Sequence, residues 1–104
     1  MNLFRRILSS LICTLLLSAV WAQNQYPDLK DRYSPPQIDS LIKIYKAKND
    51  TKGLGIAYEL NGIFFQNIYF YSTATVNNYF ISSQYYFKND DFESYYKIKK
   101  RIAD

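Results

Sequence analysis

The sequence predicts an all-α protein built from antiparallel helical hairpins, and three observations support this fold class. Apolar residues recur at helical spacing between residues 38 and 102, capping residues precede the predicted helices, and the triplet Lys-Asn-Asp occurs twice, each time between two predicted helices. The chain has 104 residues, which is enough for one domain. We expect a signal peptide at 1–22, an extended polar leader at 23–33 and a helical repeat region at 34–104.

The first 22 residues have the composition of a secretory signal peptide. Arg5 and Arg6 make the start positive, residues 7–21 form an apolar run, and a cleavage site is expected after Ala22. An uncleaved membrane anchor is the alternative, but this run is shorter than the roughly 20 residues that a spanning helix needs. The protein is therefore expected to be exported, periplasmic or secreted, and to meet the membrane only through its signal. The only cysteine, Cys13, lies in this run, so the mature chain should form no disulfide.

The first predicted helix begins after the leader, at a strong capping signal. Ser34 can cap, Pro35 suits the first helical position, and Gln37 completes a capping box. An apolar stripe at i, i+3, i+4 and i+7 follows, formed by Ile38, Leu41, Ile42 and Tyr45. These signals predict an amphipathic helix of about 14 residues that ends at Asn49-Asp50.

A second helix is predicted over residues 52–67, capped by Asp50 or Thr51. Its surface is apolar except for one polar ridge with a spacing of seven, formed by Lys52, Glu59 and Gln66. Gly55 and Gly62 should each cost about 1 kcal/mol against alanine inside a helix. We therefore expect a neighbouring backbone to approach this helix closely at the two glycines.

The stretch from Leu60 to Phe87 contains no charged residue and many aromatic ones, so membrane, β-structure and helix all compete for it. A membrane span is disfavoured because Asn, Gln, Ser and Thr occur throughout the stretch and interrupt every apolar run in it. Periodicity favours a third helix over about 71–88, with two opposed apolar faces for two neighbours. One face is expected to hold Tyr71, Ala74, Ile81 and Tyr85, and the other Val76, Phe80 and Phe87.

The last helix is expected to begin at Asp90, with Glu93 completing a second capping box. An apolar stripe continues through Phe92, Tyr95, Tyr96 and Ile102. Neither a glycine cap nor a proline precedes the end at Asp104. The repeat region is therefore expected to be truncated.

The two Lys-Asn-Asp triplets, residues 48–50 and 88–90, each join two predicted helices, as in a helical-hairpin repeat. The unit between them resembles a tetratricopeptide repeat (TPR) in the spacing of its packing residues, which are Tyr58, Gly62, Phe65, Tyr71 and Ala74. It departs from that family at Asn61, Asn78 and Ile81, and its period, from Asp50 to Asp90, is longer than is usual for the family. The resemblance implies a short α-solenoid that binds other proteins.

The whole layout is similar to the start of exported bacterial signalling proteins, whose repeats sense or scaffold outside the cytoplasm. Such proteins continue into a histidine kinase or a transcriptional regulator. The residues of this chain carry neither activity, so such a role is expected only for a longer relative.

No catalytic constellation is found. The chain has no histidine, no cysteine after processing and no glycine loop for phosphate, so we expect no enzyme, no cofactor and no metal. Two of the 13 basic residues lie in the signal, and the remainder nearly balance the 9 acidic residues, which argues against nucleic acid. The local basic cluster Lys97, Lys99, Lys100 and Arg101 is interpreted as a solvated helix face, with a phosphate or membrane contact as the alternative.

A protein or peptide partner remains the expected ligand. The candidate contact residues, on a ridge that should face outward, are Lys52, Glu59, Asn61 and Gln66; a merely solvated ridge is the alternative. The 11 tyrosines exceed what a small core needs, so some should lie at interfaces or support self-association. The alternative function is a small secreted structural or assembly protein whose aromatic stretch polymerises as β-structure.

Overall fold

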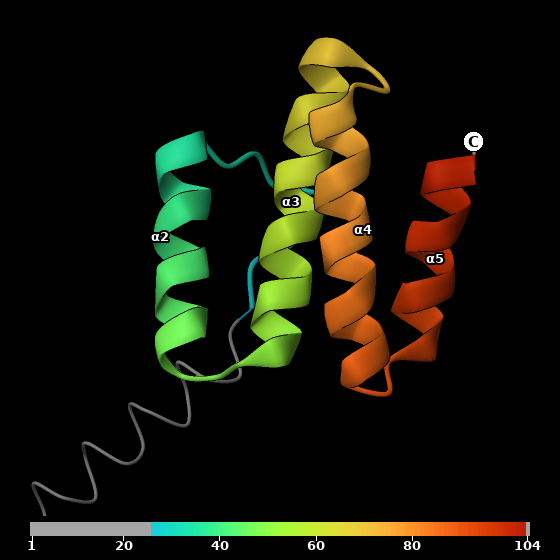
Figure 1. Cartoon of the computed structure of the whole chain (residues 1–104). Helices are drawn as coiled ribbons and strands as arrows, with labels where there is room; N and C mark the ends of the chain where they lie inside the picture. Colours follow the sequence, from blue (N-terminus) through green and yellow to red (C-terminus); the bar gives the residue numbers. More distant parts are fainter. Residues whose placement is uncertain (1–25, 104) are drawn as a thin grey trace, which may run out of the picture.

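The computed structural model describes residues 26–103, which form four α-helices and no strand (Figure 1). The helices are α2 (Pro35–Ala47), α3 (Thr51–Tyr69), α4 (Thr73–Lys88) and α5 (Phe92–Ala103). The predicted all-α class is confirmed, and the uncharged stretch is helical, as expected. The predicted signal peptide and Cys13 lie outside the described residues. Within residues 26–103, no helix has the length and apolarity that a membrane crossing requires.

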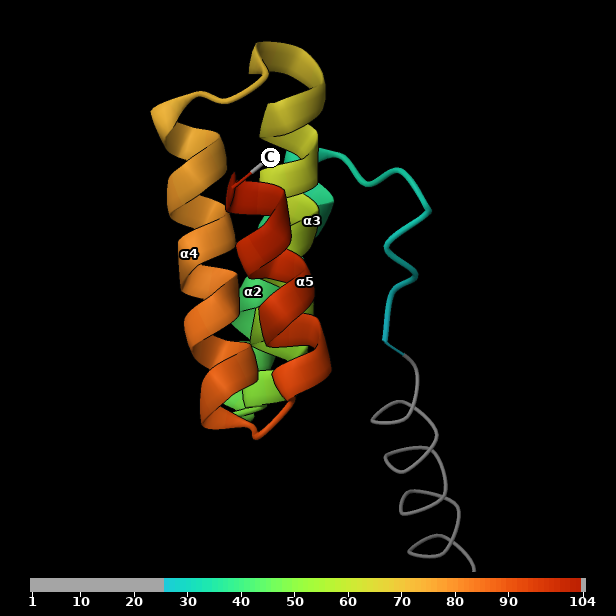
Figure 2. The same ribbon diagram turned by 90° about the vertical axis from the view of Figure 1, so that its right-hand side faces the viewer.

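Each helix packs against the helices that precede and follow it in the chain. α3 lies between α2 and α4, and α5 packs on α4 (Figure 1). Figure 2 shows α3 and α5 on the side of the molecule that faces the leader, with α4 on the far side. One face of the array is therefore built from α3, α5 and the leader together.

The capping box predicted for α2 is present. The Gln37 backbone N–H donates to Ser34 Oγ at 3.4 Å, and the Ser34 N–H donates to Gln37 Oε1 at 2.9 Å. Ile38 and Tyr45 of the predicted stripe are buried, and Leu41 and Ile42 pack beside them. The cap and the stripe together fix where α2 begins and which face it turns to α3.

The turns α2–α3 and α4–α5 have the same hydrogen bonds. In the first turn, Asp50 N–H donates to Tyr45 O and Asn49 N–H to Lys46 O; in the second, Asp91 N–H donates to Tyr86 O and Asp90 N–H to Phe87 O. Both are Schellman turns, with Asn49 at φ 53° and Asp90 at φ 57° in the left-handed position. The structural repeat therefore relates Asp50 to Asp91, whereas the two triplets in the sequence relate Asp50 to Asp90.

This offset of one position corrects the predicted start of α5. Asp91, not Asp90, caps the helix, because its Oδ1 accepts from Ser94 N–H at 3.2 Å as Asp50 Oδ1 accepts from Gly53 N–H at 3.0 Å. Glu93 completes no capping box and instead pairs with Lys97 at 3.3 Å. Asp90 occupies the left-handed turn position, where its side chain cannot cap.

The α3–α4 contact is close because glycines of α3 face tyrosine rings of α4. A Cβ atom on Gly62 would lie 2.5 Å from Cδ1 of Tyr79, and one on Gly55 would lie 2.9 Å from Cδ1 of Tyr86. Close approach at these glycines is thus confirmed, but the approaching group is a side chain and not the backbone. Ser82 adds a hydrogen bond from its hydroxyl to the Gly55 carbonyl at 2.5 Å.

The predicted apolar faces of α4 are wrong. Phe80, Ile81 and Phe87 are exposed, and the buried residues of the helix are Thr75, Tyr79, Ser82, Ser83 and Tyr86. Small hydroxyl side chains let α4 come close to α3, and each has a carbonyl partner: Thr75 Oγ1 donates to Phe70 O at 2.7 Å, whereas Ser82 donates across the interface to Gly55 O. The helix also begins later than expected, at Thr73, behind an N-cap at Ser72.

Candidate functional site: a groove between the leader and α5

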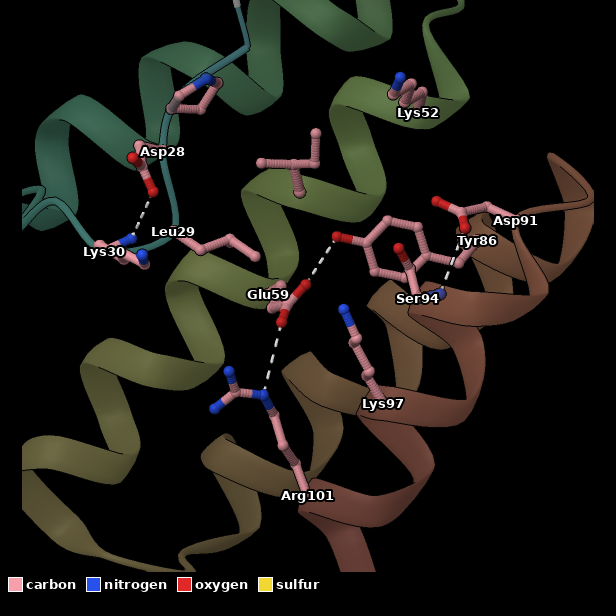
Figure 3. Close-up of a pocket in the computed structure, with 12 residues that line it drawn as sticks. Asp28, Leu29, Lys30, Lys52, Glu59, Tyr86, Asp91, Ser94, Lys97 and Arg101 are labelled. Atoms are coloured by element: carbon pink, nitrogen blue, oxygen red, sulfur yellow. Dashed lines mark hydrogen bonds and ion pairs between the residues drawn. The ribbon is translucent and has the colours of Figure 1, made fainter.

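A groove of about 520 Å³ opens on the face shared by the leader, α3 and α5 (Figure 3). The leader forms one wall with residues 27–30, and α3 forms the floor with Lys52, Ile56 and Glu59. α5 forms the other wall, and Tyr86 of α4 closes the bottom. The residues that line the groove next to α5 are Asp91, Ser94, Lys97 and Arg101.

Glu59 lies at the centre of the groove and is buried, with 4% of its surface exposed. The Tyr86 hydroxyl donates to Glu59 Oε1 at 2.6 Å, and Arg101 Nε lies 3.5 Å from Glu59 Oε2. Three helices therefore meet at one carboxylate, since Glu59 is on α3, Tyr86 on α4 and Arg101 on α5 (Figure 3). Burial of a carboxylate is tolerated because both of its oxygens have partners.

The electrostatics of the groove reflect this burial. Desolvation raises the pKa of the Glu59 carboxyl above its usual value, although the Tyr86 hydrogen bond and the charges of Arg101 and Lys97 oppose the rise. Burial, together with the neighbouring carboxylate, also raises the pKa of the Tyr86 hydroxyl. Near neutral pH the groove thus holds a neutral tyrosine against an acid that resists ionisation more than a surface glutamate does.

The leader is held against α3 by Tyr26. Its hydroxyl donates to the Asp50 carboxylate, with oxygen distances of 3.0 and 2.9 Å, and its ring lies 5.9 Å from the Tyr45 ring. Lys52 Nζ lies 5.2 Å from the centre of the Tyr26 ring. Burial and then the bond to Asp50 raise the pKa of Tyr26 to about 12. The leader was expected to be extended, but it makes a turn at residues 28–31, where Asp31 N–H donates to Asp28 O at 3.1 Å, and a single aromatic anchor fixes its start.

A second cavity of about 520 Å³ lies along the later part of the leader. The leader lines it with residues 29–33, and α3 lines it with residues such as Leu60, Ile63 and Phe64. Leu29 borders both cavities and points toward α3 (Figure 3). Residues 27–33 thus run between two spaces that they do not fill.

The four predicted contact residues do not form one outward ridge. Lys52 is exposed at the groove, but Glu59 is buried, and Gln66 accepts from the Tyr79 hydroxyl of α4. Asn61 also faces α4, where its Nδ2 donates to Asn78 Oδ1 at 3.0 Å. The prediction of an outward ridge is wrong because α4 and α5 cover the line of residues that runs from Glu59 to Gln66.

The groove residues of α5 were missed because the basic cluster was interpreted as one solvated face. The structure divides it: Lys97 and Arg101, four apart, line the groove, whereas Lys99 Nζ lies over the rings of Phe80 and Tyr95 at 5.4 and 5.3 Å. The i, i+4 spacing of Lys97 and Arg101 was the available signal. Tyr86 carried no such signal, because its partner Glu59 is 27 residues away.

Some of the residues that carry the TPR resemblance pack between helices, and others are partly exposed. Tyr58 stacks on Tyr85 with ring centres 5.8 Å apart, Gly62 faces Tyr79, and Phe65 is half-buried against Phe64 and Tyr69. Ala74 is half-buried in the first turn of α4, and its carbonyl accepts from Asn78 Nδ2 at 2.7 Å. Tyr71 was expected to open the second helix of the hairpin, but it lies before the cap and is about half exposed.

Comparisons of the chain with protein-family models, with curated proteins and with solved structures found no match. The fold and the groove define the chain as a small helical protein with a charged groove on one face.

Proposed function

We propose that the chain is an exported protein–protein interaction module, a short TPR-like solenoid, and that it holds a segment of a partner in the groove between the leader and α5. The observation that carries the proposal is the groove itself, which is open, about 520 Å³ in size, and lined by charged side chains from three separate elements. An open cleft with a few convergent polar groups is where a ligand is expected to bind.

The repeated turns support an array of this kind. Because the turns α2–α3 and α4–α5 have the same hydrogen bonds, α3 and α5 leave them in the same way and come to lie on one face. Stacked hairpins place alternate helices on the same surface, and repeat proteins use such surfaces for binding. This is the arrangement that the resemblance implies.

The charges in the groove favour a partner segment with an acidic side chain. Lys52 on α3 and Lys97 on α5 are exposed at its rim, Lys97 in an exposed ion pair with Glu93, while Glu59 is buried and paired. Asp91 is engaged in capping α5, and the Asp28 carboxylate accepts from Lys30 N–H at 2.9 Å. An acidic side chain that enters the groove therefore meets mainly lysine ammonium groups. In a longer relative, such a module would form the sensory or scaffolding part of a signalling protein.

Site-specific photo-crosslinking in cells that export the chain tests this function. A photoreactive residue at Lys97 should give a discrete adduct with one partner, and the same residue at Gln84, exposed on α4, should not. Lys52→Glu, introduced alongside the photoreactive residue at 97, should reduce the adduct because it reverses a charge at the rim. Equal adducts from both positions, unaffected by Lys52→Glu, would refute binding in the groove.

The alternative is a structural protein that polymerises through its aromatic stretch. Ile68, Tyr69, Phe70 and Tyr71 form an exposed run at the α3–α4 turn, which favours some association. Polymerisation as β-structure would require α3 and α4 to unfold first. Circular dichroism of residues 23–104 separates the two functions: a helical spectrum agrees with the module, and strand signal with thioflavin-positive fibres supports the alternative.

A further inference from the structure

We propose that the strip of α3 beneath the leader is a binding site for a peptide segment anchored by a tyrosine, and that residues 26–33 occupy this site in cis. The inference rests on the proposed function and extends its groove to the strip of α3 that the leader now covers. There the partner segment takes the place of the leader, which is an internal ligand that must leave first, and the groove residues on α3 and α5 stay in place.

The first observation is how the leader is held. Tyr26 anchors the leader: its hydroxyl donates to the Asp50 carboxylate, and its ring contacts the Tyr45 ring and the Lys52 ammonium. Beyond the anchor, Leu29 and Tyr33 are half-buried, while Asp28, Lys30, Asp31 and Arg32 are exposed. An aromatic anchor followed by a few spaced contacts is how a bound peptide is held, with few residues supplying most of the affinity.

The second observation is the empty space on both sides. The leader runs between two grooves of about 520 Å³ each, both open to solvent, and Leu29 borders both. Concave surfaces of this kind are where ligands bind, and the leader leaves part of both unfilled. Removal of the leader would join the two cavities into one channel along α3. The site is therefore larger than its present occupant.

The chemistry of the anchor defines the peptide. A tyrosine is required, because its hydroxyl donates to a carboxylate and its ring packs on Tyr45. Phenylalanine lacks the donor, and a phosphorylated tyrosine would place its charge against Asp50. Proline after the tyrosine, as at Pro27, restricts the backbone of the tyrosine to extended conformations, and the chain then turns at residues 28–31. An aliphatic residue three positions after the tyrosine, as at Leu29, points toward α3.

The test uses a labelled synthetic peptide with the sequence of residues 24–34 and the full exported chain. In the wild type the leader competes at an effective concentration in the millimolar range, so the peptide should bind weakly. The double variant Tyr26→Ala/Leu29→Asp weakens the leader and leaves every groove residue on α3 and α5 in place. It should bind the peptide at least tenfold more tightly than the wild type does.

Control variants and peptides make the result specific. Tyr96→Ala/Ile44→Asp makes the same kinds of change at exposed positions outside the groove and should bind like the wild type. A peptide with phenylalanine in place of its tyrosine should bind the double variant about tenfold more weakly, and one with alanine should not bind. Equal affinity of the peptide for the wild type and the double variant, or no loss on removal of the hydroxyl, would overturn the inference.

Two further readouts keep the outcome decisive. If the double variant loses its helical circular dichroism, Tyr26→Phe replaces it, because this change removes only the hydroxyl. Tyr26→Phe should bind the peptide severalfold more tightly than the wild type does. An unchanged affinity would refute cis occupancy. Crosslinking from Lys97 uses the chain with its leader intact. An adduct there without peptide binding would sink this inference and leave the proposed function standing.

Discussion

Glu59 shows how a buried charge holds the groove together. Among residues 26–103 it is the one acidic or basic side chain that is buried, and its partners come from α4 and α5. Removing one partner from a buried polar pair leaves the other without a hydrogen bond, at a cost of about 1–3 kcal/mol. An oxygen at position 59 that accepts from the Tyr86 hydroxyl therefore matters more to the stability of the fold than the charge of Glu59 does.

Glu59→Gln and Glu59→Leu should consequently differ. Glutamine keeps an oxygen that accepts from Tyr86, so Glu59→Gln should change the free energy of unfolding by about 1 kcal/mol or less at pH 7. Leucine leaves the Tyr86 hydroxyl buried without an acceptor, and the loss should be about 1–3 kcal/mol. Urea unfolding of the three proteins, followed by circular dichroism, measures both differences.

The same variants predict a pH dependence. Because burial raises the pKa of Glu59 in the folded state, the folded protein binds this proton more tightly than the unfolded chain. The contribution of Glu59 to stability therefore grows as pH falls through its folded pKa, and it levels off below its unfolded pKa of about 4.3. The stability of the wild type relative to Glu59→Gln should rise between pH 7 and pH 4. A difference that is independent of pH would contradict the buried, pKa-raised carboxyl.

Gly62→Ala tests the close approach of α3 and α4. The new Cβ would lie 2.5 Å from the ring of Tyr79, which is fully buried and cannot move aside. Overpacking typically costs about 1–3 kcal/mol, which exceeds the gain of about 1 kcal/mol in helix propensity. Thermal unfolding should show a lower Tm, with a smaller loss for Gly55→Ala, where the nearest distance is 2.9 Å. A raised Tm for Gly62→Ala would mean that the two helices are less closely packed.

The two Schellman turns are the elements that define the repeat. Each places a residue other than glycine in the left-handed region, where an L-residue costs about 1–2 kcal/mol and asparagine costs less than most. In each turn the next residue caps the following helix. Asp90 is therefore unfavourable in its left-handed backbone position, whereas Asp91 is required as the cap of α5.

Asp90→Gly and Asp91→Ala should accordingly have opposite effects. Glycine at 90 relieves the left-handed backbone and should raise the free energy of unfolding by about 1 kcal/mol. Alanine at 91 removes the acceptor of the Ser94 N–H and should lower it by about 1 kcal/mol. Chemical denaturation of both variants checks the pair. The reverse order of effects would restore Asp90 as the cap, as the sequence spacing suggested.

The positions of the helices could be predicted better than the side chains that each helix buries. Caps such as Ser34 and Asp50 are local signals, so the order of the helices and most of their limits could be predicted from the sequence. The buried face of α4 could not be predicted. Thr75, Ser82 and Ser83 are buried because they are small enough to fit against α3, whereas a prediction from hydropathy places Phe80 and Ile81 inside. The groove depends on pairs such as Glu59 with Tyr86, whose distance along the chain leaves no periodic pattern.

At the scale of the whole molecule, aromatic side chains remain exposed on α4 and α5. The exposed set on this face is Phe80, Phe87, Phe92 and Tyr96, and Lys99 lies over the Phe80 ring. Phe87 and Phe92 contact each other edge to face, with ring centres 5.6 Å apart, so they form part of one surface. Contiguous exposed apolar patches of this kind mark interaction sites or sites of aggregation.

We expect the protein to self-associate through this face and to be marginally stable as a monomer. A small single-layer array buries little apolar surface, and association stabilises the folded state by mass action. Sedimentation should therefore show a species larger than the monomer, and Tm should rise with protein concentration. Tyr96→Glu places a charge on the patch, where Lys100 can pair with it on the same helix, and should shift the protein toward the monomer without a loss of helicity.

Ile44→Glu, a change at an exposed position on α2, distinguishes two geometries of association. If copies meet through the same α4–α5 face, only Tyr96→Glu dissociates them, because a two-fold contact uses one patch twice. If α5 of one copy packs on α2 of the next, both variants dissociate them and the wild type forms open chains. A wild-type monomer with a cooperative melt at high temperature would contradict both geometries, because the exposed aromatic residues would then not be needed for stability.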